Sequence, residues 1–210
     1  ETGRLIIDRR TAMCMLGALP LAACNRTQPD KDVPFVGEPT KRKPLTLADK
    51  DRLVELVKRD PEIRLDMRYA TANNFTGTVL YDQARAFMVG EAAEALFRAH
   101  ERARQDGFGF TIFDAYRPWR VTKKLWDATP AGPKKNYVAN PKRGSRHNRG
   151  CAVDMTMHDL ATGALVEMPS GFDDFSEKAH RAYDDDSNAA AANAKRLESY
   201  MYAEGFIGMS

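Results

Sequence analysis

Two residues of metal-binding type stand close together in the segment SRHNRGCAVD, residues 145–154. His147 lies among arginines, and Asp154 follows seven residues later inside an apolar run. Imidazole and carboxylate groups are both ligands of zinc, and Gly150 lets the backbone turn so that the two side chains could face one ion. The same spacing also fits a solvated basic loop that leads into an ordinary strand. On spacing alone, both interpretations stay open.

Three further segments carry residue types that could bind or polarise a peptide. They are YATANNFTG at 69–77, DAYRP at 114–118 and FDDFSEKAH at 172–180. Arg117 offers a fixed cation for a developing negative charge, or it simply pairs with Asp114. Asp173 offers a carboxylate for a buried ammonium group, with Asp174 as the neighbouring alternative. A solvated acidic loop is the other interpretation of that segment.

Taken together, these segments resemble the zinc D-Ala-D-Ala peptidases. SxHxxGxAxD is the signature of that family, and residues 145–154 match each of its fixed positions. The other three segments are similar to the D-alanyl-D-alanine dipeptidase branch, in the same order and with similar intervals, so the resemblance covers residues 46–210. It implies a zinc dipeptidase that splits D-Ala-D-Ala into two D-alanines, in cell-wall metabolism or glycopeptide resistance.

The resemblance implies roles for individual residues. They are Arg117 for catalysis, His147 and Asp154 for binding one Zn²⁺, and Asp173, Ser145 and Tyr69 for binding the substrate. Asp173 would meet the free amino group of the dipeptide, which would explain a preference for dipeptides over longer chains. Ser145 would either bind a substrate terminus or cap its loop. Tyr69 would line the pocket.

The mechanism of that family also requires a general base and a third zinc ligand, which come from one late motif, ExWH. Zinc lowers the pKa of a bound water, the glutamate takes its proton, and the hydroxide attacks the peptide carbonyl. The sequence contains no ExWH, and its ending GFIGMS resembles the approach to that motif. We therefore expect a sequence that is C-terminally incomplete relative to the gene product, or else a protein that has lost activity.

Two alternative functions stay open beside the dipeptidase. One is a related peptidoglycan D,D-carboxypeptidase or endopeptidase, which a pocket open beyond the amine site would favour. The other is a peptidoglycan-binding lipoprotein without catalysis.

The N-terminal segment, residues 1–24, resembles a bacterial lipoprotein signal. Arg9 and Arg10 precede the apolar run TAMCMLGALPLAA, which is too short to span a bilayer as a mature helix, and Cys24 follows the run. We expect Cys24 to be lipidated and the protein to be exported, anchored at a membrane surface and facing the periplasm or the cell exterior. The alternative is a short buried helix with an incidental cysteine.

Composition predicts one globular domain. The 210 residues, 43% of them apolar, suffice for one core. Residues 25–45 are rich in proline and poor in large apolar groups, which favours a flexible tether, and residues 46–210 would form the domain. The formal net charge of +3 produces no strong field for nucleic acid, so we expect no nucleic-acid partner.

Helices and strands must position these segments, and the apolar periodicity predicts where they lie. Helices are expected at 46–60, 82–105, after Pro118, and at 188–206. Strands are expected at 62–69, 108–115 and 151–157, the last in a hairpin with 164–168. A long surface loop is expected at 131–148. This order of elements predicts an α+β fold with a small antiparallel sheet and flanking helices.

Overall fold

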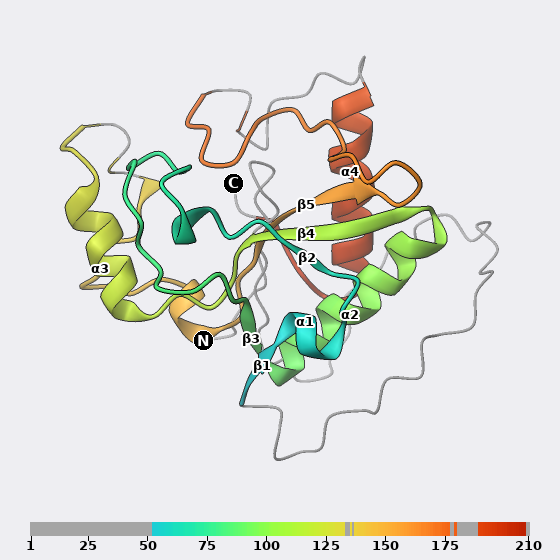
Figure 1. Cartoon of the computed structure of the whole chain (residues 1–210), viewed down its shortest axis with the longest axis horizontal. Coiled ribbons are helices and arrows are strands. Elements are labelled where there is room, and N and C mark those ends of the chain that lie inside the picture. Colours follow the sequence, from blue (N-terminus) through green and yellow to red (C-terminus); the bar gives the residue numbers. More distant parts are fainter. Residues whose placement is uncertain (1–51, 133–134, 136, 177–178, 180–188, 209–210) are drawn as a thin grey trace, which may run out of the picture.

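A three-stranded sheet lies at the centre of the molecule (Figure 1). The computed structural model describes residues 52–132, 135, 137–176, 179 and 189–208. The strands of the central sheet are β2 (Arg64–Leu65), β4 (Phe108–Asp114) and β5 (Asp154–Asp159), in the order β2-β4-β5. β2 runs parallel to β4 and β5 runs antiparallel to it, so the sheet is mixed.

A smaller antiparallel sheet and several helices surround the central sheet. The smaller sheet pairs β1 (Leu53–Glu55) with β3 (Phe87–Val89). The helices within the described residues include α1 (Leu56–Arg59), η2 (Arg68–Ala70), α2 (Gly90–Gln105), α3 (Trp119–Ala128), η4 (His147–Arg149) and α4 (Ala189–Ala203).

The main core forms where α2 packs against β4 and against α4. β4 is buried at every position after Phe108, and its nearly continuous apolar run is typical of a strand covered on both faces. α2 contributes small side chains to this core, namely Ala92, Ala93, Ala95, Ala99 and Ala103. Because alanine side chains are short, the helix backbone can approach the sheet and α4 closely. This core holds β4 rigidly, and β4 ends at the candidate site.

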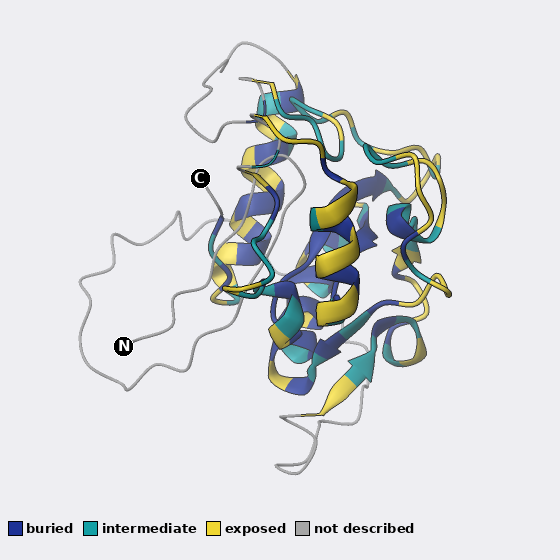
Figure 2. Cartoon of the chain, turned by 90° about the vertical axis from the view of Figure 1, so that its left-hand side faces the viewer, coloured by how far each residue is buried: buried dark blue, intermediate teal, exposed yellow. Residues whose placement is uncertain are grey.

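A second, smaller core lies beneath α3. Val121 and Leu125 of α3 form a buried cluster with Tyr69 of η2 and with Leu80 and Val138. In Figure 2, buried and exposed residues alternate along α3, as expected for an amphipathic helix on the surface. The second core therefore fixes η2, which carries Tyr69, relative to the segment that follows β4.

The α+β fold predicted from the sequence is confirmed, although the parallel pairing of β2 with β4 makes the main sheet mixed rather than purely antiparallel. The predicted strand at 108–115, the helix after Pro118 and the last helix all occur, as β4, α3 and α4. The predicted hairpin is reduced to one bridge between His158 and Leu165.

Two predicted helices begin later than expected. In the predicted helix at 46–60, residues 53–55 form β1 and only 56–59 are helical, while residues 46–51 lie outside the described residues. In the predicted helix at 82–105, residues 87–89 form β3 and the helix begins at Gly90. The two errors have one cause, because β1 and β3 pair with each other. A cross-strand pairing between distant segments overrides the local helical pattern.

Candidate metal and active site

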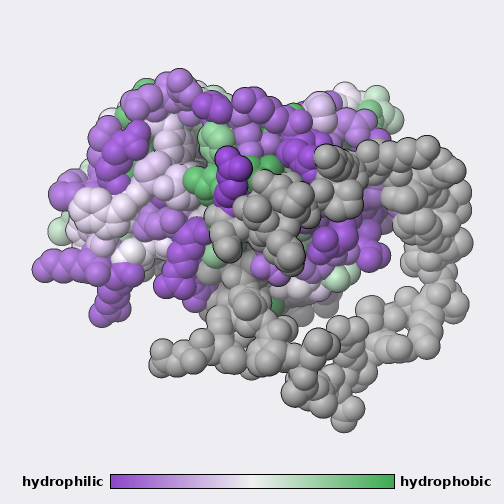
Figure 3. Space-filling view, turned by 90° about the horizontal axis from the view of Figure 1, so that it is seen from below, coloured by the Kyte–Doolittle hydropathy of each residue, from purple (hydrophilic) through white to green (hydrophobic). Residues whose placement is uncertain are grey.

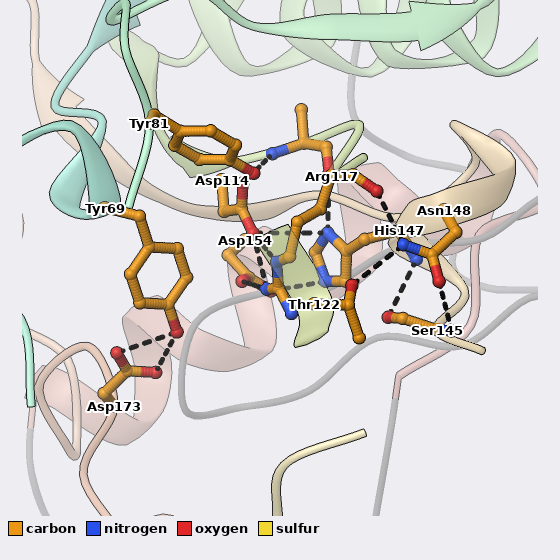
Figure 4. Close-up of polar contacts among 11 residues, drawn as sticks. Tyr69, Tyr81, Asp114, Arg117, Thr122, Ser145, His147, Asn148, Asp154 and Asp173 are labelled. Atoms are coloured by element: carbon orange, nitrogen blue, oxygen red, sulfur yellow. Dashed lines mark hydrogen bonds and ion pairs between the residues drawn. The ribbon is translucent and has the colours of Figure 1, made fainter. Parts of the chain in front are cut away.

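β4 and β5 bring two carboxylates together at one edge of the central sheet. Asp114 ends β4, Asp154 begins β5, and the two residues are partners in the antiparallel register (Figure 4). The register shifts between Ile112 and Asp114, and a bulge of this kind redirects the side chains beside it. Arg117 lies three residues further on, just before α3.

His147 reaches the same place from η4, directly before a tight turn. Gly150, which forms the turn, has a φ of 71°, and a Cβ added there would lie 2.9 Å from Leu53 Cδ2. The Nδ1 atom of His147 lies 2.7 Å from the carbonyl oxygen of Ala115. Only a protonated Nδ1 can donate to a carbonyl, so in the neutral ring the lone pair is on Nε2, the atom that faces Asp154.

The geometry of His147 and Asp154 fits one zinc ion. Nε2 of His147 lies 3.6 Å from Oδ1 of Asp154, and both residues are buried. Two ligand atoms bound to one tetrahedral zinc at about 2.0–2.1 Å are separated by roughly 3.3 Å, close to this distance. The carbonyl that holds the other ring nitrogen is the kind of partner that orients a metal-binding histidine.

Asp114 is the third acidic or histidine residue of this cluster, in which one ligand atom from each residue lies within 4.8 Å of the others. Its carboxylate, however, is surrounded by donors. Oδ1 accepts hydrogen bonds from the Tyr81 hydroxyl at 2.5 Å and the Ala115 amide at 2.9 Å. Oδ2 accepts from Nε and a terminal nitrogen of Arg117, at 2.8 Å and 2.5 Å. With these four donors in place Asp114 is paired with Arg117, which leaves His147 and Asp154 as the candidate metal ligands.

Arg117 is buried and charged. Besides Asp114, its guanidinium faces Oδ2 of Asp154 at 3.9 Å and lies 5.2 Å from the centre of the Tyr69 ring. Burial alone would lower the pKa of Arg117, but the negative charge of Asp114 raises this pKa well above its usual value. The site therefore contains a permanent cation beside the candidate metal ligands.

Asp173 lies on the other side of Tyr69. The Tyr69 hydroxyl donates to both carboxylate oxygens of Asp173, at 3.2 Å and 3.0 Å. Burial and the charge of Asp154 raise the pKa of Asp173 to about 7. The residue also has a φ of 55°, and a non-glycine residue in this region is often found at a functional site.

Ser145 and Asn148 hold the loop that carries His147. The Ser145 hydroxyl accepts a hydrogen bond from the His147 amide at 3.2 Å, the loop-capping role considered for it above. The Asn148 side chain accepts from the Ser145 amide at 2.6 Å. It also donates to the carbonyl of Arg117 at 2.6 Å and to the Thr122 hydroxyl at 2.8 Å. Asn148 thus links the loop to the first turn of α3.

The structure brings most of the sequence-predicted site residues into one place. These are Arg117, His147 and Asp154, with Tyr69 and Asp173 beside them and Ser145 in the supporting loop. Cys24 lies outside the described residues. Sequence reasoning missed Tyr81 and Asn148. Asn148 is a polar residue inside the matched motif and could have been singled out, whereas the contact of Tyr81 with Asp114 arises only from the folded loop.

Comparison with known proteins identifies similar sequences over most of the chain. The sequence profile of a peptidase family described as D-Ala-D-Ala dipeptidase matches residues 49–210. A D-alanyl-D-alanine dipeptidase of Escherichia coli K12 is 35% identical over 164 residues, which cover 78% of this chain and 83% of the relative. A protein with the same name from Enterococcus faecium is 37% identical over 165 residues, covering 70% and 82%. One from Streptomyces coelicolor is 36% identical over 161 residues, covering 69% and 80%.

Proposed function

The chain belongs to the D-Ala-D-Ala dipeptidase family of peptidases, and we propose that it hydrolyses D-alanyl-D-alanine to two D-alanines with one zinc ion. The observation that carries this proposal is the approach of His147 Nε2 to Asp154 Oδ1, at 3.6 Å, beside the buried cation of Arg117. A zinc ion bound there would polarise the scissile carbonyl and a water molecule.

The residues of the chain supply binding and charge around that ion. His147 and Asp154 would hold it, and Arg117 would stabilise negative charge on the carbonyl oxygen, because a fixed cation needs no reorganisation during the reaction. The raised pKa of Arg117 keeps the guanidinium charged at any pH at which the enzyme would work. The described residues contain no ExWH motif, so we assign to them the metal pair and the cation, and no general base.

The position of Asp173 favours a dipeptide with a free amino group. Its carboxylate would accept the substrate ammonium, while Tyr69 would set the distance between the amine site and the scissile bond. Tyr69 suits this role because its hydroxyl binds Asp173 and its ring faces Arg117 (Figure 4). One tyrosine ring therefore separates the two ends of the site.

The test is release of D-alanine by the purified protein, measured with and without added zinc. Zinc-dependent release from D-Ala-D-Ala, lost in Asp154→Ala, supports the dipeptidase. Release from long stem peptides instead indicates the related carboxypeptidase or endopeptidase. Binding to peptidoglycan without turnover of either substrate indicates the non-catalytic lipoprotein.

We also propose that the protein is exported and held at a membrane surface through lipid on Cys24. The order of basic residues, apolar run and cysteine supports this proposal. Among the residues that the structure describes, no helix combines the length and apolar character needed to cross a membrane. The face in Figure 3 is mostly hydrophilic wherever it is coloured, with small apolar patches. Cys24→Ser should move the protein from the membrane fraction to the soluble fraction; unchanged fractionation would rule out the anchor.

A further inference from the structure

Arg117 lies between the carboxylates of Asp114 and Asp154, and it is much closer to that of Asp114. It donates two hydrogen bonds to Oδ2 of Asp114, at 2.5 Å and 2.8 Å, while it remains 3.9 Å from Oδ2 of Asp154. The other oxygen of Asp154, Oδ1, faces His147 at 3.6 Å. Asp154 thus has one oxygen on the metal side and one on the arginine side.

These two neighbours compete for Asp154. A guanidinium that moved onto Asp154 in a bidentate pair would engage both of its oxygens, including the one directed at His147. A zinc ion would then have to displace a buried, charge-assisted pair before it could bind. Metal binding at this site therefore requires that another residue keep Arg117 away from Asp154.

Asp114 has the contacts needed to keep Arg117 away from Asp154. An ionised carboxylate offers about four lone-pair positions, and four donors surround Asp114. Tyr81 and the Ala115 amide hold one oxygen, which fixes the direction of the other toward Arg117. The carboxylate is completely buried, so water does not compete with the arginine for it.

We propose that Asp114, oriented by Tyr81, is a positioning residue that retains Arg117 on its own carboxylate and so keeps Asp154 available to the metal. This inference rests on the proposed function, because it takes His147 and Asp154 as the zinc ligands. It gives Asp114 a role in metal affinity although Asp114 does not bind the metal.

The test is a double-mutant cycle on zinc affinity, measured by competition with a chromophoric chelator. In the protein with Arg117, Asp114→Asn should raise the zinc Kd by about 10–100-fold, the usual effect of losing a partner outside the ligand shell. In the Arg117→Ala background, the same change should raise the Kd by less than about threefold, because no arginine remains to restrain. An equal loss in both backgrounds would overturn the inference, since a direct ligand or a through-space charge acts with or without Arg117.

Two further variants serve as an independent test and as a control. Tyr81→Phe keeps the Asp114 charge and should weaken zinc binding in the same direction but less, and only when Arg117 is present. It decides the question if Asp114→Asn does not fold, and an unchanged Kd would then overturn the inference. Asp106→Asn is the matched control, because Asp106 accepts the hydroxyl of Tyr200 in a similar pair away from the site, and it should leave the Kd unchanged.

The cycle also separates this inference from the proposed function. If the wild-type protein fails to bind zinc, or if Asp154→Ala binds it as tightly, the proposed metal site is wrong and the inference falls with it. If wild-type binding depends on Asp154 but Asp114→Asn has no effect, only the inference is overturned.

Discussion

At the scale of single residues, Asp173 connects backbone conformation most directly with substrate binding. A half-buried carboxylate in the left-handed region, φ 55°, is unfavourable both for its backbone and for its charge. The two hydrogen bonds from Tyr69 offset part of this cost. A bound ammonium group would compensate the charge further, which is why Asp173 suits the substrate amine.

Replacing Asp173 by Asn should raise KM by at least about tenfold at pH 8, because a buried ammonium would lose its charged partner. Asparagine also tolerates a positive φ, so the backbone should be kept. Steady-state kinetics with D-Ala-D-Ala measure this effect. Asp174→Asn is the control and should leave KM near the wild-type value; the reverse pattern would assign the amine site to Asp174.

The raised pKa of Asp173 also predicts how stability depends on pH in the zinc-free protein. The folded-state pKa of about 7 lies above the unaltered value of 3.8, so the folded state binds more protons between these pH values. The wild-type protein therefore loses stability as pH rises from about 4 to 7 through this group. Asp173→Asn should raise Tm at pH 8 and leave it nearly unchanged at pH 4. An equal change in Tm at both pH values would contradict the assignment.

Arg117 should contribute to turnover rather than to metal binding. Arg117→Ala should lower kcat by two or more powers of ten, on the scale of losing one oxyanion donor, with zinc retained. Arg120→Ala provides the comparison, because Arg120 lies on the same segment, is exposed and pairs only loosely with Asp82 at 3.4 Å. A near-normal rate in Arg117→Ala, measured with zinc content, would remove Arg117 from the mechanism.

At the scale of elements, the pairing of β4 with β5 depends on one glycine. Gly109 is the register partner of His158, and a Cβ added to it would lie 2.2 Å from His158 Nε2. His158 is itself buried and bonded to the Thr111 hydroxyl at 3.0 Å, so the ring has little room to move. The strand that ends in Asp114 therefore requires a residue without a side chain at this position.

Gly109→Ala should lower the free energy of unfolding by about 1–3 kcal/mol, the usual cost of overpacking a filled core. Gly171→Ala is the matched control, because nothing lies within 4 Å of a Cβ added there. Denaturant unfolding of both variants measures the difference. Equal stability of the two variants would show that His158 can move aside.

The sequence predicted well those elements whose apolar pattern directly reflects how they are buried in the fold. β4 is an apolar run that is buried on both faces, and α3 is amphipathic over a local core. Residues 53–55 and 87–89 were misassigned to helices because their strand conformation comes from mutual pairing. The apolar pattern within either segment cannot predict a pairing partner that lies more than thirty residues away in the sequence.

At the scale of the whole molecule, the site collects residues from widely separated segments. The matched motifs located Arg117, His147, Asp154 and Asp173 in the sequence. The fold brings Arg117 and Asp173 into contact with Tyr69, and Asp154 close to both Arg117 and His147. The supporting contacts of Tyr81 and Asn148 could not be derived from the sequence, because they depend on how loops from both cores meet. The chemistry of the metal determines which residue types can be ligands, whereas tertiary contacts determine which other residues hold those ligands in place.

Because the site joins β4, β5 and η4, a bound metal should stabilise the molecule as a whole. Zinc at 100 times its Kd should add about 2.7 kcal/mol to the free energy of unfolding, since it binds only the folded state. For a domain of this size that corresponds to a rise in Tm of roughly 5–10 °C. Thermal unfolding with added zinc and with a chelator measures the shift, and Asp154→Ala should abolish it. A similar rise in Asp154→Ala would place the stabilising zinc at another site.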